Sequence, residues 1–599
     1  MVVLPTVNKI IHSFFRSIKR VDIMGIADVL HEVGRAIQEK YGAAPEMALY
    51  LDLPPTIDFG DFAVSCFSIA KQFKKSPIVV AEEVVESMRT DGIIASAKAV
   101  GPYVNLKLSE GMFFEEACSC DISPSVSTGK RVMVEYLSPN TNKPLHLGHT
   151  RNGVLGMAIS NILVWAGYTV IKANLINNRG VHICKSMLAW QKLANSETPE
   201  SAGKKGDHFV GDWYVAFAKA VKDDPSLEEE AQALLLKWEK GDDDTIALWK
   251  RMNSWVYAGF AETYKELGFS FDVSYFESDL YLSGKDIVQK GLKQGIFATD
   301  ETGAIVYMLD PKKFGKSKEG GKKKKVLLRL DGTSVYTTQD LGVALKKAED
   351  YGLDVSVYVV AVEQDDHFKI LFDILKTLGY PWANQLHHLS YGMVELPNGR
   401  MKSREGTVVD ADDLISEVVA LATAELRTKN PGISEEEVIQ RAKVIGIGAI
   451  KFYLLKSNPK QKIKFDPQES ISFDGVTGPY CQYAYARACA LINRSSEWVG
   501  LDEIDYTLLG SNPEERALAQ QLVLFRGKLV RSAEEYNPSL VTNAVYELAK
   551  SFNQWYSKYP VADEGNPNLS KARLALTSKT ASVLKVALEL LGIEILDRM

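Results

Sequence analysis

The sequence predicts a multidomain α/β protein. A doubly wound parallel sheet follows an N-terminal α+β domain and precedes an all-α helical-bundle C-terminal domain. Two observations support this fold class. Strand-like and helical segments alternate through most of residues 123–409, which is typical of βαβ units and a parallel sheet. From about residue 410 onward, apolar residues recur at helical spacing only, which predicts an all-α part.

The first domain, residues 1–122, combines helical and strand-like stretches and ends before a polar, turn-rich linker at 124–129. Residues 1–20 contain no acidic residue and mix apolar with basic side chains. This pattern favours an amphipathic first helix over a transit peptide, with Met24 as an alternative start of the chain. The predicted helices of this domain are 27–41 and 79–88, and the predicted strands are 93–99 and 103–108.

The middle domain, residues 123–409, carries the predicted sheet and a helical insertion near 195–260, where Trp, Lys and Asp recur at helical spacing. Residues 410–475 are predicted to be a helical connecting segment, and 476–599 a helical domain. The strands predicted in the middle domain are 131–137, 355–362 and 386–394, and a helix is expected at 368–378. The helices predicted after it are 435–455, 480–498, 514–536 and 538–559.

Composition limits the class of protein. The 599 residues are 46% hydrophobic and 24% charged, as in an ordinary globular protein, and no apolar run is long enough to predict a transmembrane helix. A net charge of −6 argues against indiscriminate binding of nucleic acid, so DNA is not an expected partner and RNA binding must be local. Six cysteines without a C-x-x-C pair suggest neither a disulfide framework nor structural zinc, and we expect a reducing, cytoplasmic setting.

The stretch Val134–Gly156 joins a strand, a turn-rich loop and a helix. This arrangement offers unpaired backbone N–H groups to an anion at the helix N-terminus. His146 and His149 lie three residues apart, with Gly148 between them to let a base or ribose approach the backbone. An isolated pair like this is more often two surface histidines near a turn. Lys143 and Asn140 on the same loop favour a nucleotide site instead.

Several motifs resemble class I aminoacyl-tRNA synthetases and, within them, the arginine–tRNA ligase family along nearly the whole chain. H-x-G-H alone is shared with other nucleotidyl transferases. The stretches that carry the narrower resemblance are VEYLSPN, YTTQDLGVA, VEQDDHF, REGTVV, GPYCQYAYAR, the early GDFA at 60–63 and the terminal Asp597-Arg598-Met599.

The resemblance implies an N-terminal tRNA-binding domain, a Rossmann-type catalytic domain and a helical anticodon-binding domain. It implies a two-step reaction. Arginine and ATP form arginyl-adenylate and pyrophosphate, and a ribose hydroxyl of the terminal tRNA adenosine then takes the arginyl group. Mg²⁺ is expected with ATP and without a dedicated protein cage. The expected partners are L-arginine and its tRNA, and the expected form is a monomer.

An arginine site needs acceptors for a planar guanidinium with five donors, ideally carboxylates. Tyr336 and Asp340 lie four residues apart, on one face if their stretch is helical, and Glu135 lies near the end of a strand. The resemblance assigns these three to the guanidinium. It assigns Gln364 and Asn140 to the α-amino and carboxylate groups. Taken singly, Tyr336 could be core, Asp340 a surface charge and Gln364 a helix cap.

The second loop, Gly399–Gly406, departs from the Lys-Met-Ser-Lys-Ser pattern of class I because no second lysine follows Lys402. We hypothesise that Lys143 supplies the missing charge on the phosphates, while Lys402 and Arg404 close over pyrophosphate. The ATP-binding residues that the resemblance implies are His146, Gly148, His149, His367, Met401, Lys402 and Ser403.

For tRNA, Phe552, Trp555, Tyr556 and Tyr559 form an aromatic stripe on one predicted helix. They could stack on anticodon bases or fill the core of the bundle, and both interpretations remain open. Met599 at the chain end is a further candidate.

The lysine-rich run 312–325 is favoured as a solvated loop over a phosphate site. Two rival functions remain: another adenylating enzyme, most nearly a cysteine–tRNA ligase, and a synthetase-like RNA-binding regulator without catalysis.

Overall fold

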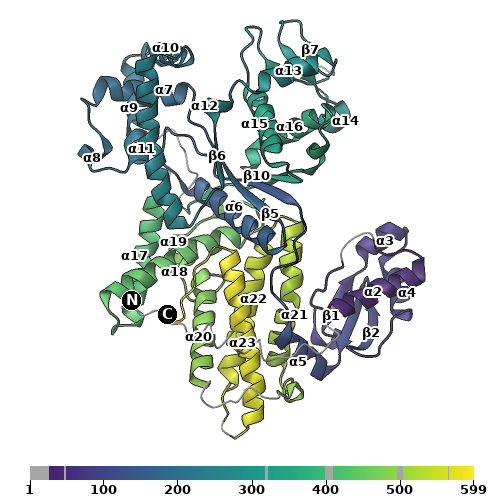
Figure 1. The fold of residues 1–599 in the computed structure, drawn as a ribbon. Coiled ribbons are helices and arrows are strands. Elements are labelled where there is room, and N and C mark those ends of the chain that lie inside the picture. The colour runs from purple at the N-terminus through teal and green to yellow at the C-terminus, as the bar shows by residue number, and fades with distance from the viewer. Residues whose placement is uncertain (1–25, 46–48, 317–321, 398–408, 496–503, 564) are drawn as a thin grey trace. The chain divides into compact units, whose positions relative to one another are not determined.

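The computed structural model describes residues 26–45, 49–316, 322–397, 409–495, 504–563 and 565–599. The chain forms two compact units (Figure 1). The predicted linker at 124–129 begins at the boundary between them, whereas the predicted connecting segment 410–475 is divided between them. The first unit comprises the residues up to Ser123, with 425–452 and 471–599, and the second comprises 124–424 and 453–470.

The second unit is built on a five-stranded sheet in which every pair of neighbours is parallel. The predicted parallel sheet is therefore confirmed. Four of the five residues of β4 are buried, as expected for a central strand covered on both faces. In sheet order, the strands are β11 (Leu386–Tyr391), β10 (Val355–Ala361), β4 (Arg131–Glu135), β5 (Thr169–Ile176) and β6 (Val273–Phe276).

Strands β4 and β10 are neighbours although more than 200 residues of chain separate them. The order of strands reverses at this pair, and doubly wound sheets bind their ligands at the carboxyl ends of the strands beside such a reversal. The segments that leave β4, β5 and β6 at their carboxyl ends begin at Tyr136, Asn177 and Glu277. The fold therefore predicts a ligand site among these three segments.

Helices account for most of the rest of the second unit, and α8–α11 occupy the stretch in which a helical insertion was predicted. An antiparallel sheet of β7, β8 and β9 was not predicted. It includes part of the lysine-rich run, whose centre at 317–321 lies outside the described residues. The helices are α6 (Leu147–Trp165), α7 (Val181–Leu193), α8 (Pro199–Ala202), α9 (Gly206–Asp223), α10 (Leu227–Glu239), α11 (Asp243–Leu267), α12 (Glu277–Leu280), α13 (Gly284–Lys293), α14 (Pro311–Phe314), α15 (Tyr336–Tyr351), α16 (Asp365–Thr377) and α19 (Pro467–Ser470), and α17 (Ala411–Lys429) begins here. The short strands are β7 (Ala298–Thr299), β8 (Ile305–Met308), β9 (Lys324–Leu328), β12 (Val394–Glu395) and β13 (Ile463–Lys464).

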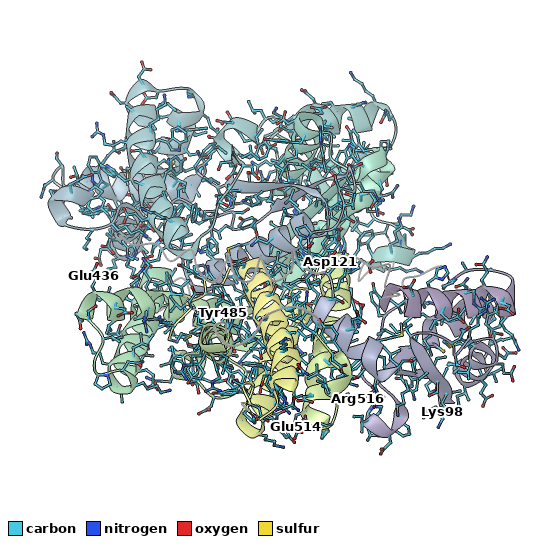
Figure 2. The ribbon with its side chains drawn as sticks, turned by 60° about the horizontal axis from the view of Figure 1, so that its bottom comes forward. Lys98, Asp121, Glu436, Tyr485, Glu514 and Arg516 are labelled. Carbon is cyan, nitrogen blue, oxygen red and sulfur yellow. The ribbon has the colours of Figure 1, made fainter. Side chains whose placement is uncertain are left out.

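In the first unit, an antiparallel sheet of order β1-β3-β2 confirms the predicted α+β part. The GDFA motif has a structural role here. A side chain at Gly60, where φ is 126°, would lie 2.6 Å from the carbonyl oxygen of Leu106. The buried Asp61 carboxylate accepts two hydrogen bonds from Arg516 (labelled in Figure 2), at 2.6 and 2.9 Å. The elements are α2 (Ile26–Tyr41), β1 (Phe62–Ser65), α3 (Phe67–Phe73), α4 (Pro77–Glu86), β2 (Ile94–Val100), β3 (Tyr103–Leu108) and α5 (Glu110–Ser119).

The remainder of the first unit is helical, as predicted. Phe552 and Trp555 are fully buried, and the Trp555 indole N–H donates to Glu515 at 3.3 Å. A base cannot stack on a ring without exposed surface, so the stacking prediction is wrong for these two rings and their bundle-core alternative is confirmed. Tyr556 is only partly buried. The helices are most of α18 (Glu435–Leu455), α20 (Gly478–Ser495), α21 (Pro513–Glu534), α22 (Ser539–Lys558) and α23 (Pro567–Leu590).

Four short 3-10 turns complete the described elements: η1 (Ile57–Phe59), η2 (Val362–Gln364), η3 (Pro381–Gln385) and η4 (Tyr506–Leu508). Among the described helices, none is both long and apolar enough to cross a bilayer. The amphipathic helix expected in residues 1–20 lies outside the described residues.

Candidate active site

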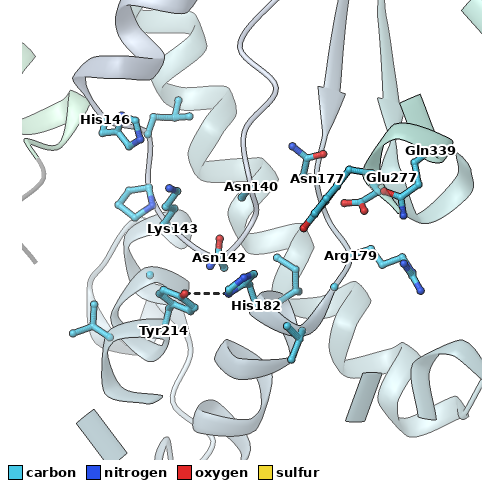
Figure 3. Close-up of a pocket in the computed structure, with 18 of the residues that line it drawn as sticks. Asn140, Asn142, Lys143, His146, Asn177, Arg179, His182, Tyr214, Glu277 and Gln339 are labelled. Atoms are coloured by element: carbon cyan, nitrogen blue, oxygen red, sulfur yellow. Dashed lines mark hydrogen bonds between the residues drawn. The ribbon is translucent and has the colours of Figure 1, made fainter. Parts of the chain in front are cut away.

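A pocket of about 840 Å³ opens at the carboxyl ends of the strands in the second unit. Its wall comes from the loop after β4, the segments after β5 and β6, the start of α15, and the insertion helix α9. In Figure 3, His146 and Lys143 lie at one side of the pocket and Glu277 and Gln339 at the other, with Asn140 and Asn142 between them. The pocket thus has two chemically different ends.

The histidine box begins helix α6. His146 is the N-cap, and its Nδ1 accepts the N–H of Gly148 at 3.1 Å, while Nδ1 of His149 accepts the N–H of His146 at 3.2 Å. The ring centroids lie 3.8 Å apart. Burial, followed by the Lys143 charge, lowers the pKa of His146 to about 4. Burial, with His146 and Lys143 adding to it, lowers the pKa of His149 well below its usual value. Both rings are therefore neutral at pH 7 and carry their proton on Nε2, the nitrogen that can donate to a phosphate oxygen.

Lys143 lies three residues before His146 and lines the same end of the pocket. Burial lowers the pKa of this lysine. No hydrogen bond or ion pair joins its ammonium to any of the described residues. A half-buried cation without a partner is costly, and an anion that enters the pocket relieves that cost.

The opposite end of the pocket, called the acidic end after its carboxylate Glu277, also contains Arg179. Glu277, the first residue after β6, lines the wall, and burial raises its pKa to about 7, with Arg179 acting against the rise and Asp340 adding to it. Asp340 lies on α15, one turn after Tyr336, so these two share a helix face as predicted. Nε2 of His367 lies 2.6 Å from the Asp340 carboxylate. Two carboxylates and a phenol near one another suit a guanidinium.

Glu135 has a different environment from the one expected. Its carboxylate is buried and forms an ion pair with Lys347 of α15, whose side chain is also buried. The Lys347 ammonium lies 4.9 Å from the centre of the Tyr358 ring. Because Glu135 already has a buried cationic partner, the structure does not bring it to the pocket wall.

Of the other predicted residues, Asn140 and Tyr336 line the pocket together with Lys143 and His146. Gly148 and His149 lie in the first turn of α6. Gln364 ends η2 beyond β10 and is exposed. The second loop, with Met401, Lys402, Ser403 and Arg404, lies outside the described residues.

Sequence reasoning missed Glu277, Arg179 and Gln339, all of which line the pocket. For Glu277 and Arg179, the available signal was position: each follows the carboxyl end of a strand of the parallel sheet. This signal needs the strand order, and β6, with only four residues, was not predicted.

The parallel sheet, the histidine box at a helix N-terminus and the lysine beside it are the features expected of a class I aminoacyl-tRNA synthetase. Three family models match the chain. Residues 119–466 match the catalytic domain of class I tRNA synthetases (R), 26–108 the arginyl tRNA synthetase N-terminal domain, and 481–599 the DALR anticodon-binding domain.

The arginine–tRNA ligase of Bacteroides fragilis is 41% identical over 567 residues, covering 90% of this chain and 94% of its own length. That of Treponema denticola is 42% identical over 591 residues, covering 96% and 98%. The solved arginyl-tRNA synthetase of Thermus thermophilus superposes with a TM-score of 0.82 at 28% identity and covers 96% of this chain and all of its own. The chain belongs to the arginyl-tRNA synthetase family.

Proposed function

We propose that the pocket at the carboxyl ends of β4, β5 and β6 is the site at which this ligase activates arginine with ATP. Family membership gives the chain the ATP-dependent attachment of arginine to tRNA through arginyl-adenylate. The observation that supports this location most strongly is that one cavity holds the Lys143 ammonium beside the neutral N–H donor of His146 at one end and the Glu277 carboxyl group at the other. ATP phosphates suit the first end, and a guanidinium suits the second.

At the phosphate end, Lys143 offers the unpartnered ammonium, and His146 and His149 offer neutral Nε2–H donors. Donors fixed in place before the reaction stabilise the charge that builds on the α-phosphate as the arginine carboxylate attacks it. Gly148, His367, Met401, Lys402, Ser403 and Arg404 remain proposed nucleotide contacts. Mg²⁺ is expected to enter with ATP and to keep mainly phosphate and water ligands; the side-chain oxygens of Asn140 and Asn142, which lie between the two ends, suit such a hard cation.

At the acidic end, we propose that Glu277 and Asp340 accept the guanidinium, with Tyr336 beside them. His367 then orients Asp340 through their hydrogen bond. Asn140 and Gln364 remain proposed partners of the α-amino and carboxylate groups. Glu135 enters this proposal only indirectly, because its carboxylate forms a buried ion pair with Lys347.

For tRNA, Tyr556 and Met599 remain proposed contacts on the domain that matches the anticodon-binding family, and the N-terminal domain is a second proposed tRNA contact. We further propose that the chain works as a cytoplasmic monomer. Sedimentation of the chain with and without its tRNA tests the stoichiometry.

The experiment that tests the proposed site is arginine-dependent ATP–pyrophosphate exchange, measured with and without tRNA. Glu277→Gln should raise the KM for arginine about 100-fold, because truncating one partner of a desolvated charge pair costs about 2–5 kcal/mol. Its KM for ATP should stay near the parental value. The matched control is Asp279→Asn, which alters an exposed carboxylate on the same short helix α12. Equal effects of the two substitutions would contradict the placement of the guanidinium.

A further inference from the structure

A second cluster of charged side chains lies outside the residues used above. It joins the helical insertion to the start of α17. Asp412 accepts hydrogen bonds from Lys205 at 2.6 Å, from His208 at 2.9 Å and from the Thr263 hydroxyl at 2.8 Å. These three donors come from the start of α9 and from α11. One carboxylate at the start of α17 is thus held by three groups of the insertion.

The charged groups of this cluster are largely buried, so each carboxylate depends on a nearby cation. The Asp207 carboxylate is fully buried, forms no hydrogen bond with any described residue, and lies 3.5 Å from the Lys205 ammonium. Asp410 lies 3.5 Å from His208 and caps α17 by accepting the N–H of Asp412 at 2.8 Å. The hydrogen bond to Asp412 raises the pKa of His208, with burial acting against it. Removing either cation leaves buried carboxylates without compensation.

Such a set of carboxylates and a histidine could in principle hold a metal ion. Here the Lys205 ammonium lies among the oxygens of Asp207 and Asp412, where a metal ion would have to displace it. In this cluster, the lysine of the protein itself neutralises the carboxylates. We therefore ask which segments of the chain the cluster holds together.

The position of Asp410 and Asp412 in the chain gives that function. They follow the second loop directly, and the backbone around them pairs with the histidine box: the N–H of Leu147 donates to Val409 and the N–H of Ala411 donates to Leu145, at 3.1 and 3.0 Å. His208 and Asp410 also line the pocket.

The segment before the second loop is held in a similar way. The fully buried Arg151 of α6 donates to the carbonyl oxygens of Gly392 and Met393, and also to those of Pro459 and Gln461. The segment before the second loop therefore contacts Arg151 of α6. The segment after the loop pairs with the backbone of Leu145 and Leu147 at the start of the same helix. The insertion contributes side-chain hydrogen bonds to the segment that follows the loop.

We propose that Lys205 and His208 are positioning residues for the nucleotide half of the reaction: through Asp412 and Asp410, they fix the segment that connects the second loop to α17 against the histidine box. The proposal rests on the proposed function of the pocket. The insertion thereby holds Val409 and Ala411, which pair with the backbone of Leu147 and Leu145, in place beside the histidine box.

The test is arginine-dependent pyrophosphate exchange at saturating tRNA, with separate KM values for ATP and arginine. Lys205→Met should lower kcat about 10- to 100-fold and raise the KM for ATP about tenfold, as a displacement near 1 Å does, while the KM for arginine stays within about twofold. Lys205→Arg, which keeps a cation, should restore most of both. Thr263→Val, which removes one donor to Asp412 without a change of charge, should shift the same parameters less.

The matched control is Lys204→Met, because Lys204 is the exposed neighbour of Lys205 and forms its ion pair with Asp212, which lines the pocket wall but is itself exposed, and not with Asp412. A purely structural role predicts a loss of kcat with both KM values unchanged, and that result, or no difference from the Lys204→Met control, would overturn the proposal. If the parent itself showed no arginine-dependent exchange, the proposed function would fail. Measuring ATP binding directly would still test the role of Lys205 in that case, because the Lys205→Met chain should bind ATP more weakly than the parent and the control.

Discussion

The ion pair of Glu135 and Lys347 offers the sharpest test of how the arginine end of the pocket is held. Tyr336, Asp340 and Lys347 occupy one face of α15, at positions i, i+4 and i+11. Tyr336 lines the pocket, Asp340 follows it one turn later, and Lys347 reaches Glu135 at the end of β4. The pair therefore sets the rotation of the helix that carries the proposed arginine contacts.

The substitution Lys347→Met keeps the length and apolar stem of the side chain but removes its charge. The side chains of Lys347 and Glu135 are 1% and 6% exposed. At that burial, loss of one partner should lower the free energy of unfolding by about 3–5 kcal/mol, because a carboxylate stays buried without its cation. The double variant Glu135→Gln with Lys347→Met should recover most of that loss, since replacing both charges is often close to neutral.

Urea unfolding followed by circular dichroism measures these free energies, and the four chains of the cycle give the coupling between the two residues. Lys346→Met is the matched control: its ammonium pairs only with Asp350, at 48% side-chain exposure, and its effect should stay within about 0.5 kcal/mol. The Lys347→Met substitution should also raise the KM for arginine more than the KM for ATP. A Lys347→Met chain within about 1 kcal/mol of the parent, or additive single effects, would refute the reasoning.

Two further predictions concern the phosphate end. Lys143→Ala should slow arginine-dependent exchange about 10²- to 10³-fold, because it removes a preorganised cation; a nearly parental rate would end that assignment. His146→Asn should keep the α6 cap, whereas His146→Ala should lose about 1 kcal/mol of stability, measured by urea unfolding. Burial lowers the pKa of His146 to about 4, below the value near 6.5 of an unfolded chain. The unfolded state therefore binds the proton first. The stability present above about pH 6.5 is lost as pH falls toward about 4, and His146→Asn should reduce that loss.

The nucleotide half of the site could be predicted from the sequence because it is local. Strand, turn, histidine box and helix are all contained in or begin within Val134–Gly156, and the predicted strand 131–137 ends two residues early, at Glu135. Helix α6 begins at Leu147, because the His146 ring serves as its cap. Side-chain capping of this kind depends on a ring orientation that spacing does not show.

The arginine half could be predicted only in part because it depends on contacts distant in sequence. Glu277 becomes visible as a site residue once β6 is known to lie at the edge of the sheet. Lys347 reaches Glu135 across 212 positions. The aromatic stripe of α22 shows the same limit: spacing placed Phe552 and Trp555 on one face, but only packing against the other helices shows that this face is buried.

The difference between a local nucleotide half and an arginine half built from distant segments has a consequence for substrate specificity. A local motif such as the histidine box can be shared by enzymes that activate different substrates, since it contacts only the nucleotide. The proposed recognition of arginine uses Glu277 from the end of β6 and Asp340 from α15, and the sheet order and the buried Lys347 fix where these two elements lie. Substitutions that loosen that buried pair should therefore alter the choice of amino acid before they alter the use of ATP. Substitutions at Lys205 should do the reverse.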